Sequence, residues 1–383
     1  MTTLTQLIEY HCPNGVEYVK LGDVATVRSG WGFPTKYQGG SSGVPFFKVA
    51  DMNHVDNQTH LQRSMNYVER SVLKSMKAGT APAGTVVFPK IGAAVATNKK
   101  RLLVEESSYD NNVAGVIPGE GLNPLFLFYF FLGFDLCTIA LQSGATPSIR
   151  KSAIEGISLP LPPREVQDAI VDRLDAFAGL IESLDSEIAL REKHFEYFRE
   201  QLLSFDESDD VEYVKLGDVA TVKAGSSVSK QKIAESAGVY PVINSGREPL
   251  GFIAEFNSTD PIGITTRGAG VGFVSWTEGP HFKGNLNYNV KVDSHTVNDR
   301  FLYFTFKEHS ESIRNLCSFA GIPALNLKSI KTLTFPLPPR EVQDAIVEKL
   351  DIMQALIYNL KQEHELRKTQ FEYYREKLLT FNS

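Results

Sequence analysis

Two stretches of this sequence occur twice, letter for letter, while the residues between the copies differ. Residues 16–27 and 211–222 both read VEYVKLGDVATV, and residues 160–171 and 336–347 both read PLPPREVQDAIV. The first pair is offset by 195 positions (211 minus 16) and the second by 176 (336 minus 160). The chain is therefore a tandem duplication with a constant frame and two divergent inserts. This organisation suits a molecule that keeps its assembly surfaces and varies what it recognises.

The bulk composition is that of a globular protein with more than one domain. The chain has 383 residues, of which 42% are hydrophobic and 22% charged. Its three cysteines are far apart and odd in number, which fits neither a disulfide framework nor a zinc site. The N-terminus does not resemble a signal peptide, and the apolar run 125–134 is too short to span a membrane. We therefore expect a cytoplasmic location.

The net charge of −6 is unevenly distributed along the chain. Residues 28–159 contain 13 basic and 9 acidic side chains, and residues 223–335 contain 12 and 9. The acidic surplus lies in the repeated frame, including the run DESDD at 206–210. A positive surplus confined to the inserts weakly favours an anionic partner for them.

Each PLPP block is expected to start a long helix, because consecutive prolines keep the preceding chain extended and fit the first helical turn. Downstream, apolar residues recur in alternating steps of four and three, a spacing that predicts a coiled coil of roughly 42 residues and about 63 Å. The apolar positions of the first copy are Ile170, Leu174, Phe177, Ile181, Leu184, Ile188, Phe195, Phe198, Leu202 and Phe205, and those of the second are Ile346, Leu350, Met353, Ile357, Leu360, Phe371, Tyr374, Leu378 and Phe381.

Two partners are possible for these helices. They could pair with each other, most simply antiparallel about a pseudo-twofold axis, or each could pack on its own insert or on another chain. Arg191 and Arg367 interrupt the apolar series at matched positions, where a polar residue can fix the register of a coiled coil. The acidic run 206–210 is expected to end the first helix and act as a hinge.

Each insert is expected to be a mixed α/β (α+β) domain. Residues 85–88, 263–266 and 273–276 are short β-prone runs, whereas 125–134 and 301–306 read as buried helices. The inserts align loosely, with Phe88 to Ala93 facing Thr265 to Gly270 and Gly144 to Pro147 facing Phe319 to Pro323. One ancestral domain with two diverged surfaces is the simplest account.

No catalytic constellation is recognisable. The sequence lacks a GxxxxGK[ST] phosphate loop, an Asn-Pro-Pro-aromatic motif for amino-group methylation, and histidine pairs at metal-binding spacing. The glycine-rich run 268–272 has neither the spacing nor the following helix of a dinucleotide fingerprint and reads as a turn. We therefore expect neither a catalytic residue nor a metal site in this chain.

The duplicated VEYVKLGDVATV leader, the duplicated PLPPREVQDAIV helix start, the two long heptad helices and the two dissimilar inserts together resemble the specificity subunit of a type I restriction–modification system. The resemblance covers essentially the whole chain. It implies that each insert is a target-recognition domain that reads one half of a split, asymmetric double-stranded DNA sequence, while an antiparallel coiled coil sets the gap between the halves.

The resemblance also implies the partners. Two methyltransferase subunits that use S-adenosylmethionine would bind the frame, and restriction subunits driven by ATP with Mg²⁺ would complete the nuclease. This chain would bind no cofactor and catalyse nothing. The expected parts are a leader (1–27), recognition domain 1 (28–159), long helix 1 (160–205), a linker with the second leader (206–222), recognition domain 2 (223–335) and long helix 2 (336–383).

Cations in the inserts are the candidates for DNA contact. Lys99, Lys100 and Arg101 are expected to crown a turn between strands, where they could clamp phosphates or form a solvated loop. Lys90 and Arg267 are expected to occupy matched positions beside a glycine, and Arg267 suits a bidentate contact with guanine. The remaining candidates are Arg150 and Arg247.

Identical polar residues of the two frame copies are the candidates for partner binding: Glu165, Gln167 and Asp168, with their copies Glu341, Gln343 and Asp344. Recent duplication, or recombination between the repeats, would also keep them identical. Two other classes of function remain open at this point, a coiled-coil adaptor with two ligand- or peptide-binding domains and an enzyme with an unfamiliar active site.

Overall fold

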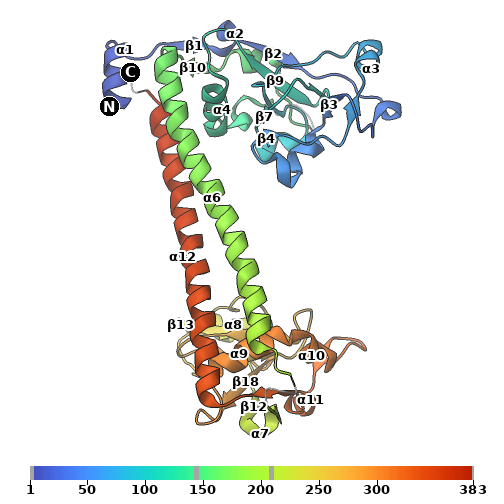
Figure 1. Cartoon of the computed structure of the whole chain (residues 1–383), viewed down its shortest axis with the longest axis vertical. Helices are drawn as coiled ribbons and strands as arrows, with labels where there is room; N and C mark the ends of the chain where they lie inside the picture. The colour runs from blue at the N-terminus through green and yellow to red at the C-terminus, as the bar shows by residue number, and fades with distance from the viewer. Residues whose placement is uncertain (1–3, 142–145, 207–210, 382–383) are drawn as a thin grey trace. The chain divides into compact units, whose positions relative to one another are not determined.

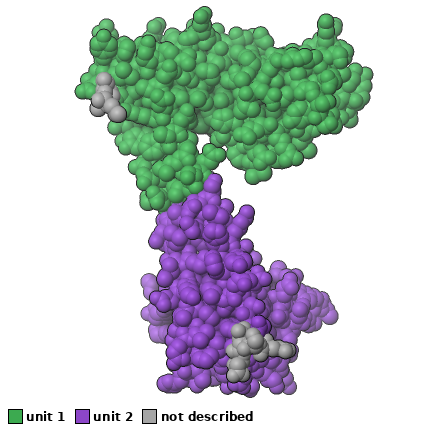
Figure 2. Space-filling model, in the orientation of Figure 1, with its two compact units in different colours: residues 1–184, 363–383 green, residues 185–362 purple. Residues whose placement is uncertain are grey.

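The computed structural model of the chain describes residues 4–141, 146–206 and 211–381 (Figure 1). The chain forms two compact units, unit 1 with residues 1–184 and 363–383 and unit 2 with residues 185–362 (Figure 2). Each unit holds one insert and part of each long helix. Within the described ranges, no helix is both long and apolar enough to cross a membrane.

The insert of unit 1 contains short helices and strands that alternate along the chain. Its elements, with the preceding leader, are α1 Leu4–His11, β1 Tyr18–Lys20, α2 Leu21–Val24, β2 Ala25–Ser29, η1 Thr35–Tyr37, β3 Val44–Phe47, η2 Val49–Asn53, η3 Val55–Asn57, β4 His60–Leu61, β5 Tyr67–Val68, α3 Arg70–Ser75, β6 Val86–Pro89, η4 Ala93–Thr97, β7 Arg101–Leu103, β8 Ser108–Tyr109, β9 Val113–Pro118, α4 Pro124–Gly133, η5 Leu136–Ile139, α5 Lys151–Glu155 and β10 Ser158–Pro160.

The insert of unit 2 follows a similar order. Its elements are β11 Glu212–Lys215, α7 Leu216–Val219, β12 Ala220–Ala224, α8 Lys230–Glu235, β13 Ala237–Ile243, β14 Phe252–Ile253, β15 Ile262–Thr265, β16 Val274–Trp276, β17 Phe282–Lys283, β18 Asn287–Val292, α9 Asp299–Glu308, α10 Ser310–Asn315, β19 Cys317–Ser318, β20 Ala324–Leu325, α11 Leu327–Lys331 and β21 Thr334–Leu337.

The sheets of the two inserts correspond. Unit 1 has a sheet of order β2-β9-β6-β7-β4 and a smaller one of order β5-β3-β8, and unit 2 has β12-β18-β15-β16 and β14-β13-β17. The repeated leader and the repeated PLPP block meet in a two-stranded sheet in each unit, where Tyr18 pairs with Pro160 and Tyr213 with Pro336. These four residues obey the two sequence offsets, so the duplicated letters produce a duplicated structure.

One mainly buried helix in each insert connects the sheet to the long helices. In α4, Asn123 caps the helix by accepting hydrogen bonds from two backbone amides, and Pro124 occupies the first turn, where its missing N–H is harmless. Asn298 caps α9 in the same way. Phe126 and Phe131 of α4 are fully buried, and each such side chain stabilises the fold by about 1.5–3 kcal/mol.

The long helices are α6, Arg164–Leu203, and α12, Arg340–Leu379, each of 40 residues. Within each unit they run antiparallel, as shown in unit 1 by the rings of Phe177 and Tyr374, whose centroids are 5.2 Å apart, and in unit 2 by the ion pair from Lys361 Nζ to Glu192 Oε1 at 2.6 Å. The helices therefore pair with each other, as one of the two expectations had it.

Their N-terminal turns also pack on the inserts, so the alternative holds in part. Ile170 and Leu174 belong to the core that contains α4, whereas Ile346 and Leu350 contact Phe301 and Phe304. The expected apolar series is buried or half-buried along the described parts of both helices, with one exception. Phe198 is 45% exposed.

The polar interruptions of the seam repeat as well. Arg191 bonds Glu187, one turn earlier, at 2.7 Å, and Arg367 bonds Glu363 with the same spacing. The expected boundaries between leader, inserts and helices stay a prediction. The expected hinge at 206–210 and the matched residues Gly144 and Ala145 lie largely or wholly outside the described residues.

Candidate nucleic-acid interface

Two loops converge at equivalent places in the two inserts. In unit 1 they are residues 48–66, between β3 and β5, and residues 90–100, between β6 and β7; we call them the first loop pair. The second loop pair in unit 2 consists of residues 244–251 and 266–273. The strands that carry them correspond, yet the loops differ in length and sequence. These loops therefore differ between the two copies of the duplicated fold.

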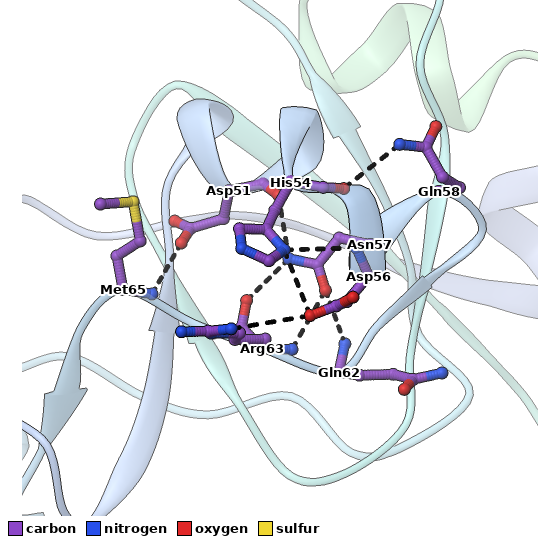
Figure 3. Close-up of polar contacts among 8 residues, drawn as sticks. All are labelled: Asp51, His54, Asp56, Asn57, Gln58, Gln62, Arg63 and Met65. Atoms are coloured by element: carbon purple, nitrogen blue, oxygen red, sulfur yellow. Dashed lines mark hydrogen bonds and ion pairs between the residues drawn. The ribbon is translucent and has the colours of Figure 1, made fainter. Parts of the chain in front are cut away.

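Loop 48–66 of the first loop pair is held by a buried asparagine (Figure 3). Asn57 is fully buried; its Nδ2 donates to the backbone oxygens of Asp51 and Arg63 at 2.9 and 2.7 Å. Its Oδ1 accepts from the amides of Gln62 and Arg63, each at 3.0 Å. One side chain thus satisfies four backbone groups and fixes the loop without a regular ladder.

A buried aspartate braces the same loop. The carboxylate of Asp51 accepts from the amide of Lys48 at 2.6 Å. It also accepts from the amide of Met65 at 2.8 Å (Figure 3). Val55 and Met65 project from it, 75% and 69% exposed. Because the hydrogen bonds of Asn57 and Asp51 fix the backbone, binding through the exposed side chains costs little conformational entropy of the loop.

The structure corrects the expectation of three cations at the tip of a turn. Lys100 and Arg101 are only 2% and 6% exposed. Arg101 donates to the carbonyl oxygens of Asn57 and Met52, so it supports loop 48–66 from inside. Of the three cations, Lys99 lies nearest the surface, half-buried and bonded to Asn53.

Lys100 is a buried cation, not a surface cation. Its Nζ donates to Asn98 Oδ1 at 2.8 Å and to the carbonyl oxygen of Phe134 at 2.5 Å. Burial is the main cause that lowers the pKa of Lys100 to about 8, with the Asp135 carboxylate acting in the opposite direction. Its geometry is that of a structural contact rather than a phosphate clamp.

The expected match between Lys90 and Arg267 is wrong by one residue. The carbonyl of Lys90 accepts from Ile149, and the carbonyl of Thr266 accepts from Leu325, which is the copy of Ile149 at the offset of 176. Lys90 therefore corresponds to Thr266, and Arg267 corresponds to the residue after Lys90. Glycines of positive φ follow at 92 and 268, as a tight turn requires.

The other candidate cations differ in exposure. Arg150, Arg247 and Arg267 are exposed, whereas Lys90 is half-buried and its Nζ donates to Ser29 Oγ at 2.7 Å. Burial lowers the pKa of Lys90. Contact of these residues with DNA stays a prediction. Arg247 belongs to the second loop pair, with its guanidinium carbon 5.5 Å from the ring centroid of Phe273.

The frame residues expected to bind partners turn out to join the frame to the insert. Gln167 is 1% exposed, and its Oε1 accepts from the amide of Asn123, the cap of α4, at 2.8 Å. Its Nε2 donates to the carbonyl oxygens of Gly121 and Pro162 at 3.0 and 2.8 Å. Asp168 accepts from Asn123 Nδ2 at 2.6 Å. We call this arrangement the Gln–Asn lock.

The same lock exists in unit 2. Gln343 is fully buried; it accepts from the amide of Asn298 at 2.8 Å and donates to the carbonyl oxygens of Thr296 and Pro338 at 3.0 and 2.8 Å. Asp344 accepts from Asn298 Nδ2 at 2.7 Å. The expectation that the two glutamines form an exposed docking surface is therefore wrong.

Some of the other frame candidates remain accessible to a partner. Glu165, Glu341 and Asp344 are exposed, and Asp168 is half-buried. Partner contact by these four carboxylates stays a prediction.

One contact between long helix and insert is present in unit 2 and missing in unit 1. Arg199 Nε bonds Glu308 Oε2, at the end of α9, at 2.6 Å. The matched arginine of α12, Arg375, faces Gly133, the last residue of α4. Its Nε is buried without a hydrogen-bond partner among the described residues, and burial lowers its pKa.

Gly133→Glu should therefore stabilise unit 1. A Cβ at position 133 would lie 3.4 Å from Arg375 Nε, so a carboxylate can reach the unsatisfied group. We expect a gain of about 1 kcal/mol and a Tm higher by roughly 2–4 °C in calorimetry. Gly133→Ala is the control for helix propensity alone. A glutamate variant no more stable than the alanine variant would contradict this account.

Comparison with known proteins gives a consistent family. The model of the type I restriction modification DNA specificity domain matches residues 13–190 and again residues 208–367. A putative type I restriction enzyme specificity subunit of Haemophilus influenzae is 27% identical over 299 residues, which cover 71% of this chain and 76% of that protein.

Two solved structures share the fold over nearly the full chain. The S subunit of a type I restriction-modification system from M. genitalium has a TM-score of 0.64 at 16% identity, covering 97% of this chain and 98% of that one. The HsdS subunit from Thermoanaerobacter tengcongensis has a TM-score of 0.52 at 17% identity, covering 96% and 97%.

Proposed function

Because the chain belongs to the type I restriction modification DNA specificity family, we propose that each insert reads one half of a split, asymmetric target in double-stranded DNA. The observation that carries the proposal is the pair of family matches, each covering one repeat whose frame is constant and whose loop pair has diverged. Two different loop pairs on one duplicated scaffold predict two different half-sites.

The chemistry of the loop pairs supports nucleic acid as the ligand. The exposed groups include guanidinium and amide side chains, which can bond base edges and phosphates. Arg63 and Gln62 belong to the first loop pair, and Arg247 and Arg267 to the second. Recognition by fixed loops requires no cofactor, and in this proposal the chain binds none and catalyses nothing.

The frame supports two copies of one partner. Leu190 of α6 and its copy Leu366 of α12 are exposed, as are Tyr197 and its copy Tyr373. Exposed apolar side chains at matched positions fit a surface that is used twice. We assign it to two methyltransferase subunits, in the cytoplasm, which use S-adenosylmethionine and flip out the target adenine while this chain holds the duplex. Restriction subunits driven by ATP with Mg²⁺ complete the complex.

Inserting seven residues into each long helix should lengthen the gap between the half-sites and leave the half-sites unchanged. A heptad adds about 10 Å of helix and preserves the seam, since the apolar pattern repeats every seven residues. The insertions must be matched in α6 and α12 to keep the antiparallel pairing. An unchanged gap in the methylated sequence would contradict a spacing role for the helices.

Binding of duplex DNA by the chain, co-purified with a methyltransferase subunit expressed together with it, tests the proposal. We expect affinity that falls steeply with salt, because cations that contact phosphates release counterions. A complex with no salt-dependent affinity for duplex DNA would instead support a coiled-coil adaptor. Turnover of DNA and S-adenosylmethionine by the purified chain alone would indicate an enzyme.

A further inference from the structure

A pocket of about 600 Å³ lies beside the second loop pair in unit 2. Its walls are formed by Arg247, by the glycine-rich loop 269–273, by Lys307 of α9 and by Arg314 of α10. The glycines of this loop allow a close approach of the backbone. A Cβ on Gly270 would lie 3.2 Å from the carbonyl oxygen of Ser245, so the two loops are in direct contact.

The pocket gathers three cations without neutralising them. In the part of unit 2 that the structure describes, Arg247, Lys307 and Arg314 form no ion pair, although the Glu311 carboxylate also lines the pocket. Arg247 and Lys307 flank the ring of Phe273, at 5.5 and 5.3 Å from its centroid. Burial, with the charges of Arg199 and Arg247, lowers the pKa of Lys307.

Neighbouring cations of the same unit are compensated. Arg199 bonds Glu308 at 2.6 Å and Arg300 bonds Asp351 at 2.8 Å. Like charges around one pocket destabilise the unit by mutual repulsion, and an anion in the pocket would remove that cost. The arrangement therefore points to an anionic ligand.

We propose that this pocket binds one backbone phosphate of the DNA half-site read by unit 2. The inference rests on the proposed function, which assigns DNA binding to the second loop pair. A phosphodiester is a compact anion that two guanidinium groups and one ammonium can surround. It would fix the position of the duplex against the loops without reading sequence.

The first insert lacks the lysine of this pocket. The position of α4 that corresponds to Lys307 of α9 is Leu132, since both helices follow an asparagine cap and have ten residues. In unit 1 the cation beneath the loop pair, Arg101, bonds backbone carbonyls instead. The two inserts therefore hold the duplex by different contacts, and the phosphate clamp belongs to unit 2.

The test uses the complex with its methyltransferase and a duplex that carries the mapped target. The triple variant Arg247→Gln, Lys307→Gln and Arg314→Gln should bind about 100-fold more weakly near 0.15 M salt. The slope of log affinity against log salt should fall by about 1, with sequence preference unchanged. Lys307→Arg keeps the charge and should retain most of the affinity, and Lys291→Gln controls for charge removed elsewhere in the unit.

Neutral methylphosphonate placed at single positions of the duplex gives the sharpest readout. At one position, within the half-site of unit 2, the substitution should weaken binding by the parent complex and leave binding by the triple variant unchanged. If every position weakens both proteins equally, the pocket binds no phosphate. If the parent complex itself shows no salt-dependent binding, the proposed function fails instead. Retained co-purification of the variant with the methyltransferase shows that it is folded.

Discussion

Exchange of residues 28–159 for the corresponding segment of a relative should change one half of the methylated sequence and leave the other half as in the parent complex. The exchanged segment contains the whole first loop pair and none of the second. Modularity also requires that the graft fit the frame. Gln167 accepts from the backbone amide of Asn123, whereas Asp168 accepts from its side chain, so the incoming domain must supply an asparagine at the cap of its own α4 to keep both hydrogen bonds.

Methylated positions in the DNA of cells that express each chain measure this outcome. A graft that keeps the asparagine should give a new half-site at full methylation. A matched graft with Asn→Leu at that cap should lose the side-chain hydrogen bond to Asp168 and the two hydrogen bonds that cap the helix, and methylation should fall because the insert docks poorly. A change in both halves of the sequence after the intact graft would show that the inserts do not act independently.

Gln343→Met should destabilise unit 2 by about 3 kcal/mol. Methionine has a similar length and volume but cannot replace three hydrogen bonds, so the amide of Asn298 and the carbonyls of Thr296 and Pro338 lose their partner in a buried place. We expect a Tm lower by roughly 6–12 °C for the transition of that unit. Gln167→Met should have an equal effect on unit 1, since the lock is the same.

The control for this prediction is Glu341→Gln, two residues away and exposed, for which we expect a change below about 0.5 kcal/mol. Calorimetry of the complex measures both variants. If Gln343→Met is as stable as Glu341→Gln, the Gln–Asn lock contributes little to the stability of its unit. The sequence identity of the two frame copies would then need another explanation.

The large features of the fold could be predicted from the sequence because they follow from periodicity and repetition. The alternation of apolar residues by four and three gave α6 and α12 and most of their seam. The short β-prone runs near 86 and 262 became β6 and β15, and the apolar run after Asn123 became α4. In each case the local pattern and the tertiary packing agree.

The candidate site was less predictable, since charge in a sequence does not show which acceptor a cation will meet. The sequence indicates that Lys100 and Arg101 are surface cations. In the structure both side chains are buried, and they donate hydrogen bonds to the backbone carbonyls of Phe134 and Asn57. Gln343 is identical to Gln167 in the other copy, which favours a docking role. Identity between copies, however, does not show whether a side chain is buried, and Gln343 is fully buried.

The correspondence between the two inserts was also not predictable at one point. Lys90 and Arg267 were matched by side chain, whereas the register is set by backbone hydrogen bonds that leave no trace in the letters. Lys307 and Arg314 could not be predicted as site residues, for a similar reason. They lie on two separate short helices, α9 and α10, and only the fold brings them to Arg247.

The measurement that tests the central claim most directly is single-molecule sequencing of methylated adenines in DNA from cells that express the methyltransferase with and without this chain. The account predicts a split, asymmetric motif with two unlike halves, and its disappearance when the chain is omitted. Adenine methylation at the same motif in the absence of the chain, or a methyltransferase that does not co-purify with it, would contradict the account.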